Sequence, residues 1–408
     1  MPRLLSVNSY NYVRGGSDVV YFEHANIFKK FGWSNINFSM RHPSNIPDEN
    51  EDLFADRVDY GAAKNIFEQT RSASRVVYSL QAKRRIKKLI DRYPPDVAHF
   101  HIIHHHLSPS VLSEVRRRGI PSVMTAHDLK LACPNYKMLN ELGICERCKG
   151  GRILNVVRHR CIKQSLLGSA LIALESAVHK SLNLYEKNLD AIVAPSEFYR
   201  SKFIEWGWSE EKIFKIPNFI ARQEGYHVMP AAGDYILYFG RLSEEKGIST
   251  LISASAATNI RVVIAGTGPE AAKLRILADH LSAPVDFVGF KAGAELWDLV
   301  EQARAVVIPS EWYENSPMSV LEAFSRGKIV IGAAIGGIPE LVLPEVTGWL
   351  FRPGDADQLA SVISKVMSLS DPHIRAMGDN AQQFVLREHS PEVYYERMIK
   401  LYNHIGLN

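Results

Sequence analysis

The sequence predicts two successive α/β domains of similar size. Short apolar runs of strand length alternate with helical patterns, as expected for parallel sheets with crossover helices. This alternation breaks at an irregular polar stretch, residues 216–234, and then begins again. A chain of 408 residues also has room for about two or three domains. We therefore expect an N-terminal domain at residues 1–218, a C-terminal domain at 219–389 and a final helical segment at 390–408.

The N-terminal half opens with a strand, a glycine-rich loop and a helix. The strand is "RLLSVNSY" and the loop is "NYVRGGSD". The stretch "DVVYFEHANIFKKFGW" has helical spacing, with Ser17 as the expected N-cap and Gly32 as the stop. Further buried strands are predicted in "DVAHFH" (96–101), "PSVMTAH" (121–127) and "DAIVAPS" (190–196).

The C-terminal half repeats the strand–helix pattern. Each predicted strand ends in Gly, Ser or Pro and leads into a helical pattern: "YILYFGR", "IRVVIAG", "PVDFVGF", "AVVIPS" and "KIVIGAA". The tail "SPEVYYERMIKLYNHI" reads as an amphipathic helix with Ser390 and Pro391 at its start.

Composition points to an ordinary globular protein with an uneven charge. Hydrophobic residues make up 46% and charged residues 23%. No apolar run approaches the roughly 18 residues that span a bilayer. The start "MPRLLSVNSY" also lacks the features of a signal peptide, so we expect a cytoplasmic protein.

The charge differs between the two halves of the chain. Residues 1–200 hold 29 Lys and Arg against 19 Asp and Glu, whereas residues 201–408 hold 19 Lys and Arg against 25 Asp and Glu. The basic half could meet a nucleic acid, an anionic membrane or a phosphorylated ligand.

Two carboxylates bracket the stretch "SEWYENSPMSVLEAFSRGK" (310–328). Pro317 suits the first turn of a helix, with Ser316 as its N-cap and Gly327 as its stop. Glu314 then lies in the loop before this helix, and Glu322 lies about 1.5 turns inside it. Alternatively, Glu314 is a solvated loop residue and Glu322 is an ordinary helix residue.

The helix N-terminus between these carboxylates is a candidate anion site. The free amides of Met318 and Ser319 and the helix dipole favour a phosphate. The strand "AVVIPS" brings the loop to the carboxyl edge of a sheet, where α/β proteins bind ligands. Because carboxylates repel phosphates, the flanking glutamates would serve hydroxyl groups instead. We infer a ligand that joins ribose, diphosphate and sugar.

Three further strand ends carry residues suited to such a ligand. "FGRLSEEKGIST" offers Arg241 and Lys246, which could neutralise a diphosphate without a metal or could be surface charges. Gly266 lies in the Gly-rich end "AGTGPE", which suits a nucleotide edge. The loop "VGFKAG" (288–293), with Phe290, is expected to meet the base.

These motifs resemble the glycosyltransferases of family 4, which are retaining enzymes with the glycosyltransferase-B fold. The C-terminal resemblance lies in "GRLSEEKG", "AGTGPE", "VGF", "PSEWYENSPMSVLEAFSRGK", "GGIPELV" and "GWLF". The N-terminal half is similar through "RGGSD", "DVAHFH", "HD" and "APSEFYRSKF". Only residues 133–163 fall outside it, as an insertion found in part of the family. The resemblance implies two facing Rossmann-like domains with a nucleotide-sugar cleft between them, and a C-terminal helix that crosses back to the N-terminal domain.

The resemblance also implies roles in the donor site. Arg241 and Lys246 would bind the donor diphosphate. Glu322 would bind the ribose hydroxyls, and Glu314 would contact the donor sugar. The amides near Met318 and Ser319 would contact the hydroxyls of this sugar or the donor phosphate. The family often has Phe-Gly after the first glutamate, whereas this chain has Asn315-Ser316-Pro317. Because Pro317 removes one amide, the sugar contacts around Asn315 can differ from those of the family.

In the N-terminal domain, the resemblance places Gly15 and Gly16 at the diphosphate and His127 beside the transferring sugar. Arg241, Lys246, Glu314 and His127 then form the expected catalytic set. The implied reaction moves a hexose from a UDP- or GDP-linked donor to a saccharide or lipid-linked saccharide with retention, in surface polysaccharide or glycolipid synthesis. No catalytic metal is expected, and the leaving phosphate can deprotonate the acceptor. The alternatives are a nucleotide-sugar 2-epimerase of the same fold and a silent nucleotide-sugar-binding protein.

Histidines, cysteines and one acidic pair raise the question of metals. The five histidines of "HFHIIHHHL" (99–107) could bind a metal, contact a sugar or acceptor, or be plain loop residues. Asp355-x-Asp357 superficially matches a metal motif of another transferase fold, but we interpret Asp355 as a helix cap. The four cysteines are Cys133, Cys145, Cys148 and Cys161. They could bind a structural zinc ion, because Cys145-x-x-Cys148 is half of a zinc knuckle, or they could be free thiols or form a disulfide.

A basic helical stretch suggests a further partner. "QAKRRIKKLIDRYPPD" (81–96) holds six cations, which could be a solvated face or could dock on an anionic membrane. A basic N-terminal acceptor domain suits a lipid-diphosphate-linked sugar at the inner leaflet. A nucleic-acid partner is not expected, because no recognition motif accompanies the charge.

Overall fold

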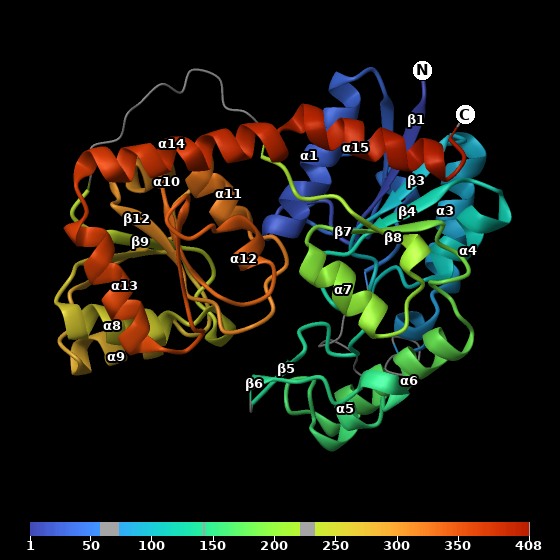
Figure 1. Cartoon of the computed structure of the whole chain (residues 1–408). Coiled ribbons are helices and arrows are strands. Elements are labelled where there is room, and N and C mark those ends of the chain that lie inside the picture. Colours follow the sequence, from blue (N-terminus) through green and yellow to red (C-terminus); the bar gives the residue numbers. More distant parts are fainter. Residues whose placement is uncertain (58–72, 142, 221–232, 408) are drawn as a thin grey trace. The chain divides into compact units, whose positions relative to one another are not determined.

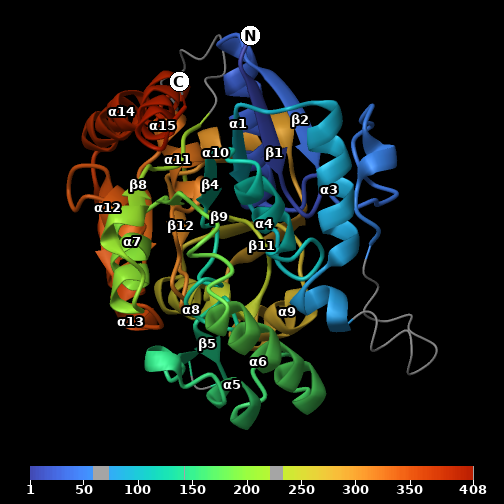
Figure 2. The same cartoon turned by 90° about the vertical axis from the view of Figure 1, so that its right-hand side faces the viewer.

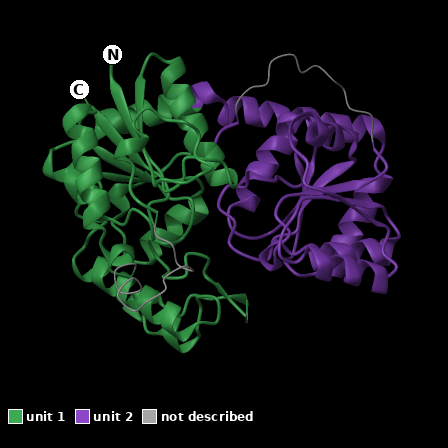
Figure 3. Ribbon diagram, turned by 180° about the vertical axis from the view of Figure 1, so that it is seen from behind, with its two compact units in different colours: residues 1–216, 394–408 green, residues 217–393 purple. Residues whose placement is uncertain are grey.

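The computed structural model in Figure 1 describes residues 1–57, 73–141, 143–220 and 233–407. The chain folds into two compact units. Unit 1 comprises residues 1–216 and 394–408, and unit 2 comprises residues 217–393 (Figure 3). Each unit holds one six-stranded parallel sheet. The prediction of two Rossmann-like α/β domains is therefore confirmed.

The sheet of unit 1 has the strand order β2-β1-β3-β4-β7-β8. Its strands are β1 (Arg3–Val7), β2 (Ser34–Phe38), β3 (Val97–Phe100), β4 (Ser122–Thr125), β7 (Ala191–Ala194) and β8 (Ile213–Lys215). Every residue of β3, β4 and β7 is buried, as in a parallel sheet that is covered on both faces. The strand order reverses at β1, so right-handed crossovers place helices on both faces.

The helices of unit 1 include an extension beyond the sheet. They are α1 (Gly16–Lys30), α3 (Leu80–Arg92), α4 (Ser110–Arg117), α5 (Asn155–Arg158), α6 (Leu166–Ser181), α7 (Glu197–Glu205) and α15 (Pro391–His404), whose first residues still belong to unit 2. A short hairpin, β5 (Leu139–Asn140) and β6 (Gly143–Ile144), precedes α5. Figures 1 and 2 both show α5 and α6 together at one end of the unit. In the described parts of the chain, no helix combines the length and apolarity needed to cross a membrane.

The sheet of unit 2 has the strand order β11-β10-β9-β12-β13-β14. Its strands are β9 (Ile236–Phe239), β10 (Val262–Ala265), β11 (Val285–Gly289), β12 (Ala305–Ile308), β13 (Val330–Ala333) and β14 (Gly348–Phe351). Its helices are α8 (Ile248–Thr258), α9 (Ala271–His280), α10 (Gly293–Gln302), α11 (Met318–Ser325), α12 (Ile338–Leu341), α13 (Ala356–Ser368) and α14 (Asp371–Glu388). This order reverses between β9 and β12, as in dinucleotide-binding Rossmann sheets.

Two predicted helix starts are wrong by one or two residues. Helix α11 begins at Met318, and Pro317 rather than Ser316 is its N-cap. Pro317 has the extended ψ angle of 122°, so its backbone lies outside the helix. Helix α1 begins at Gly16, ahead of the predicted cap Ser17, and makes no side-chain cap hydrogen bond.

The interpretation of Asp355 as a helix cap is confirmed. Its carboxylate accepts a hydrogen bond of 2.9 Å from the backbone N–H of Gln358 at the start of α13. Asp357 lies in the first turn of the same helix, where a negative charge interacts favourably with the helix dipole.

The predicted linker at 216–234 falls largely on residues 221–232, which lie outside the described residues. The chain entering unit 2 is tied to the segment that leaves it. The backbone N–H of Ile220 donates to the carbonyl of His389 at 3.0 Å, and His389 Nδ1 lies 2.6 Å from the carbonyl of Asn218. The entry and exit of unit 2 therefore lie side by side.

Helix α15 is fastened to unit 1 by buried tyrosines. The hydroxyl of Tyr394 lies 2.8 Å from His24 Nδ1. The hydroxyl of Tyr402 lies 2.6 Å from His99 Nδ1 and 3.1 Å from His24 Nε2. His24 and His99 come from α1 and β3, so the last helix completes the packing of these two elements.

We predict that Tyr402→Phe destabilises unit 1 by about 1–3 kcal/mol, because it leaves buried nitrogens of His99 and His24 without a partner. The matched control is Tyr395→Phe. Tyr395 is half-buried, and its hydroxyl accepts a hydrogen bond of 3.2 Å from Trp33 Nε1. Urea denaturation followed by circular dichroism would measure both variants. Equal losses in the two variants would contradict the role assigned to the buried network.

Candidate functional site

The predicted donor residues gather at one edge of the sheet of unit 2. Arg241 and Lys246 follow β9, Gly266 follows β10, Phe290 follows β11 and Glu314 follows β12. Because these strands are parallel, their carboxyl ends share an edge. The reversal between β9 and β12 is the position at which open α/β sheets bind ligands.

Glu314 is the anchored carboxylate of this edge. Its side chain is 8% exposed, so the alternative of a solvated loop residue is wrong. Its Oε1 accepts hydrogen bonds from Lys246 Nζ at 2.6 Å, Ser310 Oγ at 2.6 Å and Trp312 Nε1 at 2.9 Å. Burial alone would raise the pKa of Glu314, but the Lys246 ammonium and these hydrogen bonds hold it below its usual value. All three donors meet Oε1, and Oε2 accepts no side-chain hydrogen bond from the described residues.

Close backbone packing fixes the loop that carries Glu314. The backbone N–H of Gly337 donates to the carbonyl of Glu314 at 2.8 Å. Gly336 has a φ of +61°, and a Cβ there would lie 2.2 Å from the same carbonyl oxygen. Gly247 has a φ of +64°, and a Cβ there would lie 1.9 Å from the carbonyl of Pro309. The loops after β9, β12 and β13 therefore lock together only with glycine at these positions.

The two predicted cations differ in their surroundings. Lys246 is held by Glu314, and its Nζ also lies 5.2 Å from the centre of the Trp312 ring. Arg241 is exposed, and its guanidinium makes no hydrogen bond or ion pair with the described residues. One cation is thus positioned by the protein, and the other is available to meet an anion.

Glu322 is a carboxylate with no partner in the described parts of the chain. It lies in the second turn of α11 and is only partly exposed, and its carboxylate receives no hydrogen bond from the described residues. Burial raises the pKa of Glu322 to about 7. The amides of Met318 and Ser319 lie in the first turn of the same helix, where N–H groups lack acceptors within the helix. Glu322 and this helix N-terminus are arranged to receive hydroxyl and anionic groups.

Gly266 and Phe290 flank this edge in different ways. A Cβ at Gly266 would lie 1.8 Å from the carbonyl of Gly240, so close packing alone requires a glycine there. Phe290 is exposed on the loop after β11 and is free to pack against a planar ligand. Asn315, between Glu314 and Ser316, is half-buried.

In unit 1, Gly15 and Gly16 form an open helix start. Gly15 is the N-cap of α1, both glycines are exposed, and a Cβ at Gly15 would meet nothing within 4 Å. Packing within the unit therefore does not require Gly15. Arg14 beside them is held by Asp18, with Nε to Oδ2 at 3.1 Å, and stacks on Tyr10. This leaves the first turn of α1 accessible to a phosphate.

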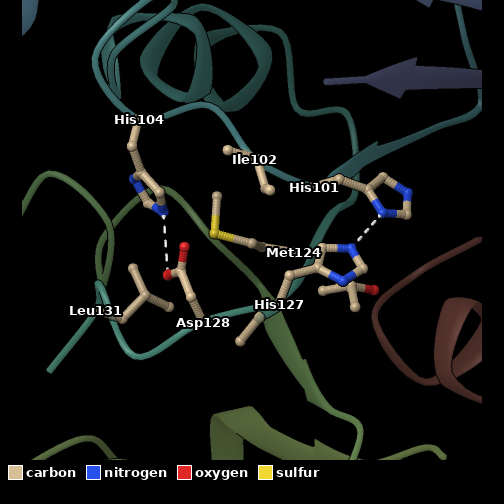
Figure 4. Close-up of a pocket in the computed structure, with 9 residues that line it drawn as sticks. His101, Ile102, His104, Met124, His127, Asp128 and Leu131 are labelled. Carbon is tan, nitrogen blue, oxygen red and sulfur yellow. Dashed lines mark hydrogen bonds and ion pairs between the residues drawn. The ribbon is translucent and has the colours of Figure 1, made fainter. Parts of the chain in front are cut away.

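His127 follows β4 and pairs with a second histidine. Its Nε2 lies 2.8 Å from Nδ1 of His101, which follows β3 (Figure 4). Burial lowers the pKa of His127 to about 4 and that of His101 well below its usual value, so both rings are neutral at pH 7. His101 Nε2 is buried without a hydrogen-bond partner among the described residues. The sequence had no signal for this pairing, because 26 residues separate the two rings.

A second polar group lies beside this pair. His104 Nε2 approaches Asp128 Oδ1 at 3.9 Å (Figure 4), and burial raises the pKa of Asp128 to about 6. Both pairs line a cavity of about 10 Å³, which is room for about one water molecule. Lys130 extends the group through a buried ion pair of 2.7 Å with Glu175 of α6. The loop after β4, which carries His127, is thereby bonded to α6.

The predicted zinc cysteines lie in one neighbourhood but are not arranged as a metal site. All four are free thiols. Burial raises the pKa of Cys133 to about 12 and that of Cys148 to about 11, and neighbouring cysteines raise both further. Within the described ranges, no three His, Cys, Asp or Glu side chains are grouped to hold a metal, and this includes the histidines of residues 99–107. Zinc binding stays a prediction.

Two family models match the chain. The model "Glycosyltransferase Family 4" matches residues 15–224, which is 210 of 408 residues. The model "Glycosyl transferases group 1" matches residues 227–384. The boundary between these matches lies within the predicted linker.

Curated relatives agree with these models. An alpha-D-kanosaminyltransferase of Streptomyces kanamyceticus is 28% identical over 42% of this chain and 46% of its own. The sulfoquinovosyl transferase SQD2 of Arabidopsis thaliana is 27% identical over 72% of this chain and 54% of its own. The chain thus spans about half the length of these relatives.

Solved structures match the whole chain. Sucrose-phosphate synthase of Thermosynechococcus elongatus has a TM-score of 0.73 at 21% identity, with 99% of both chains covered. Anabaena HepE in complex with UDP-glucose has a TM-score of 0.66 at 16% identity, with 98% of this chain and 99% of its own covered. The predicted glycosyltransferase-B fold is confirmed.

We predict that Glu322→Gln removes a pH dependence of stability. Burial raises the folded-state pKa of Glu322 from 4.5 to about 7, so the carboxyl favours the folded state below pH 4.5 and loses this contribution as pH rises through 7. Relative to Glu322→Gln, the wild type should lose about 1–3 kcal/mol of unfolding free energy between about pH 5 and pH 8. Urea denaturation across this range measures the difference.

Glu314→Gln is the matched control, because the pKa of Glu314 is lowered and its contribution has the opposite sign. That contribution is present above pH 4.5 and is lost as pH falls through the lowered pKa. Parallel pH profiles for the two variants would rule out the assignment.

Proposed function

Because the chain belongs to glycosyltransferase family 4, we propose that it is a retaining glycosyltransferase that uses a nucleotide-sugar donor. The observation that carries this proposal is the sheet edge of unit 2, where Lys246 is anchored on Glu314 while Arg241 and Glu322 have no partner among the described residues. The relatives named above transfer kanosaminyl and sulfoquinovosyl groups, and HepE was solved with UDP-glucose. A UDP- or GDP-linked hexose fits these groups.

Arg241 and Lys246 would stabilise the diphosphate as it leaves. The bond between the anomeric carbon and the phosphate oxygen breaks, and a bond to the acceptor oxygen forms on the same face. The acceptor proton passes to the leaving phosphate oxygen, so no separate base is needed. Two positive charges aimed at the developing negative charge supply electrostatic stabilisation, usually the largest catalytic effect. We therefore propose that catalysis needs no metal.

The carboxylates and the histidine would orient the donor. Glu322 would accept hydrogen bonds from the ribose hydroxyls, and Glu314 Oε2 would accept one from the sugar. His127 is neutral, so it can share a hydrogen bond with a sugar hydroxyl without adding charge. The start of α1 at Gly15 and Gly16 would receive the diphosphate.

The acceptor is proposed to be a saccharide or a lipid-linked saccharide, in the synthesis of surface polysaccharide or glycolipid. A relative of 28% identity is named a lipopolysaccharide 1,2-N-acetylglucosaminetransferase, from Salmonella typhimurium. Four cysteines in a chain of 408 residues do not make the disulfide framework of a secreted protein, so we propose a cytoplasmic location. Release of free sugar and nucleotide without a glycoside product would favour a 2-epimerase instead, and tight binding without turnover would favour a silent binding protein.

We predict that one nucleotide family, UDP, GDP or ADP with its sugar conjugates, raises the melting temperature of the wild type, with or without EDTA. A ligand at one hundred times its dissociation constant adds about 2.7 kcal/mol of stability. Glu322→Ala and Lys246→Ala should weaken this stabilisation, because they remove the proposed ribose and diphosphate contacts.

The control variant is Glu345→Ala, which removes an exposed carboxylate paired with Lys365 at 3.0 Å in the same unit. It should leave the nucleotide shift intact. If no nucleotide stabilises the wild type, both the transferase and the silent-binding proposals lose their support.

We also predict one structural zinc ion per chain, held by Cys133, Cys145, Cys148 and Cys161. Their shared neighbourhood supports the proposal, although the thiols would have to lose their protons and approach the ion to about 2.3 Å. Elemental analysis of protein purified without chelators should find zinc in the wild type and none in Cys145→Ser. Four titratable thiols and no zinc in the wild type would refute the site.

A further inference from the structure

Helix α6 of unit 1 exposes large apolar residues to the solvent. Leu167 is 83% exposed and Leu174 is 56% exposed. These residues are seven positions apart, so they lie on the same face of the helix. Ala170 and Ala177 complete this stripe and are exposed as well. A surface helix of a globular protein normally directs such large apolar side chains toward the core.

The inward face of α6 holds polar residues as well as Ile172 and Ala173. Glu175 is fully buried and pairs with Lys130 at 2.7 Å. His179 Nε2 lies 2.6 Å from the carbonyl of Val77. These contacts fix the orientation of the helix, because turning it over would bring the buried charge of Glu175 to the surface and break its ion pair. The exposed leucines are therefore a stable feature of the fold.

Exposed cations lie close to these leucines in the sequence. Residues 144–187 hold eight Lys and Arg against three Asp and Glu. Two of these acids are already paired, Glu175 with Lys130 and Glu146 with Lys202. We define the docking surface as the exposed leucines and the exposed cations next to them in the sequence: Leu154, Leu166, Leu167, Leu174, Arg152, Arg158, Arg160, Lys163 and Lys180.

We propose that this docking surface binds the interface of an anionic lipid bilayer. The leucines would enter the boundary between headgroups and acyl chains, and the cations would meet the lipid phosphates. The charge selects this occupant over a second copy of the chain, because a second copy would bring the same cationic surface against itself. Exposed apolar residues that are rimmed by charge mark an interaction site.

The cations of α3 offer a weaker contact. Four of its apolar residues, Ala82, Ile86, Leu89 and Ile90, are buried, and only Leu80 at its first position is exposed among them, so its outer face is mainly charged. Such a face attracts an anionic membrane through charge alone, and salt screens that attraction. The docking surface adds apolar contacts, which salt does not screen.

The position of α6 connects docking to the proposed acceptor side. The Lys130–Glu175 pair joins α6 to the loop that carries His127. Docking would thus hold this loop near the membrane, where a lipid-linked acceptor resides. The inference extends the proposed function, but vesicle binding requires neither the donor site nor turnover, so each can fail without the other.

The test is sedimentation of the full chain with vesicles. The wild type should bind vesicles of equal parts phosphatidylglycerol and phosphatidylcholine, and it should bind vesicles of phosphatidylcholine alone much less. The double variant Leu167→Gln/Leu174→Gln should weaken binding by about tenfold or more, because it removes two apolar anchors. The matched control is Ile276→Gln on α9 of unit 2, where the side chain is 69% exposed, and it should bind as the wild type does.

A charge variant separates the two contributions. Arg158→Gln/Arg160→Gln/Lys163→Gln should abolish the preference for phosphatidylglycerol. Circular dichroism melting and the nucleotide shift should match the wild type in every variant, which shows that folding and the donor site are intact. Wild-type binding that is absent, or equal in the leucine variant, would overturn the inference. So would a dimer in light scattering that the leucine variant dissociates, since a second copy would then cover α6.

Discussion

The ion pair between Lys246 and Glu314 organises the edge of unit 2. It joins the loop after β9 to the loop after β12, the two strands that flank the reversal of strand order. Ser310 and Trp312 add hydrogen bonds to the same oxygen, and Gly336 lets the loop after β13 approach the same backbone. The burial of one charge would be costly without this pairing. The pair keeps Glu314 ionised and rigid, and this leaves the other polar groups around it to the ligand.

Much of the fold could be predicted because its strands are buried on both faces. Continuous apolar runs such as β7, β10 and β12 can be recognised as strands from the sequence. The strand β2 was missed because its sequence, SNINF, is mostly polar, and β8 because it is only three residues long. The start of α11 was misplaced because Ser316 is a good cap in isolation, whereas the extended backbone of Pro317 delays the helix by one residue.

Part of the site could be predicted for a related reason. Arg241, Lys246 and Glu314 follow strands, and the parallel sheet brings such positions to one edge whatever their separation in sequence. Their mutual contacts could not be predicted, because Lys246 and Glu314 are 68 residues apart and only the packing of glycine loops sets their distance. The same holds for His101 and His127, which the sequence places at the ends of two strands 26 residues apart and which pair in the structure as neutral rings.

The two units handle buried ionisable groups in different ways. Unit 2 keeps Glu314 charged through Lys246 and gives Glu322 no partner among the described residues, so a ligand can complete that site. Unit 1 holds His24, His99, His101 and His127 neutral, since burial lowers the pKa of each. A buried ion pair in the same unit, Lys130–Glu175, secures α6 and thereby forces leucines to the surface. The stability of the fold and the exposure of the docking surface therefore have the same cause.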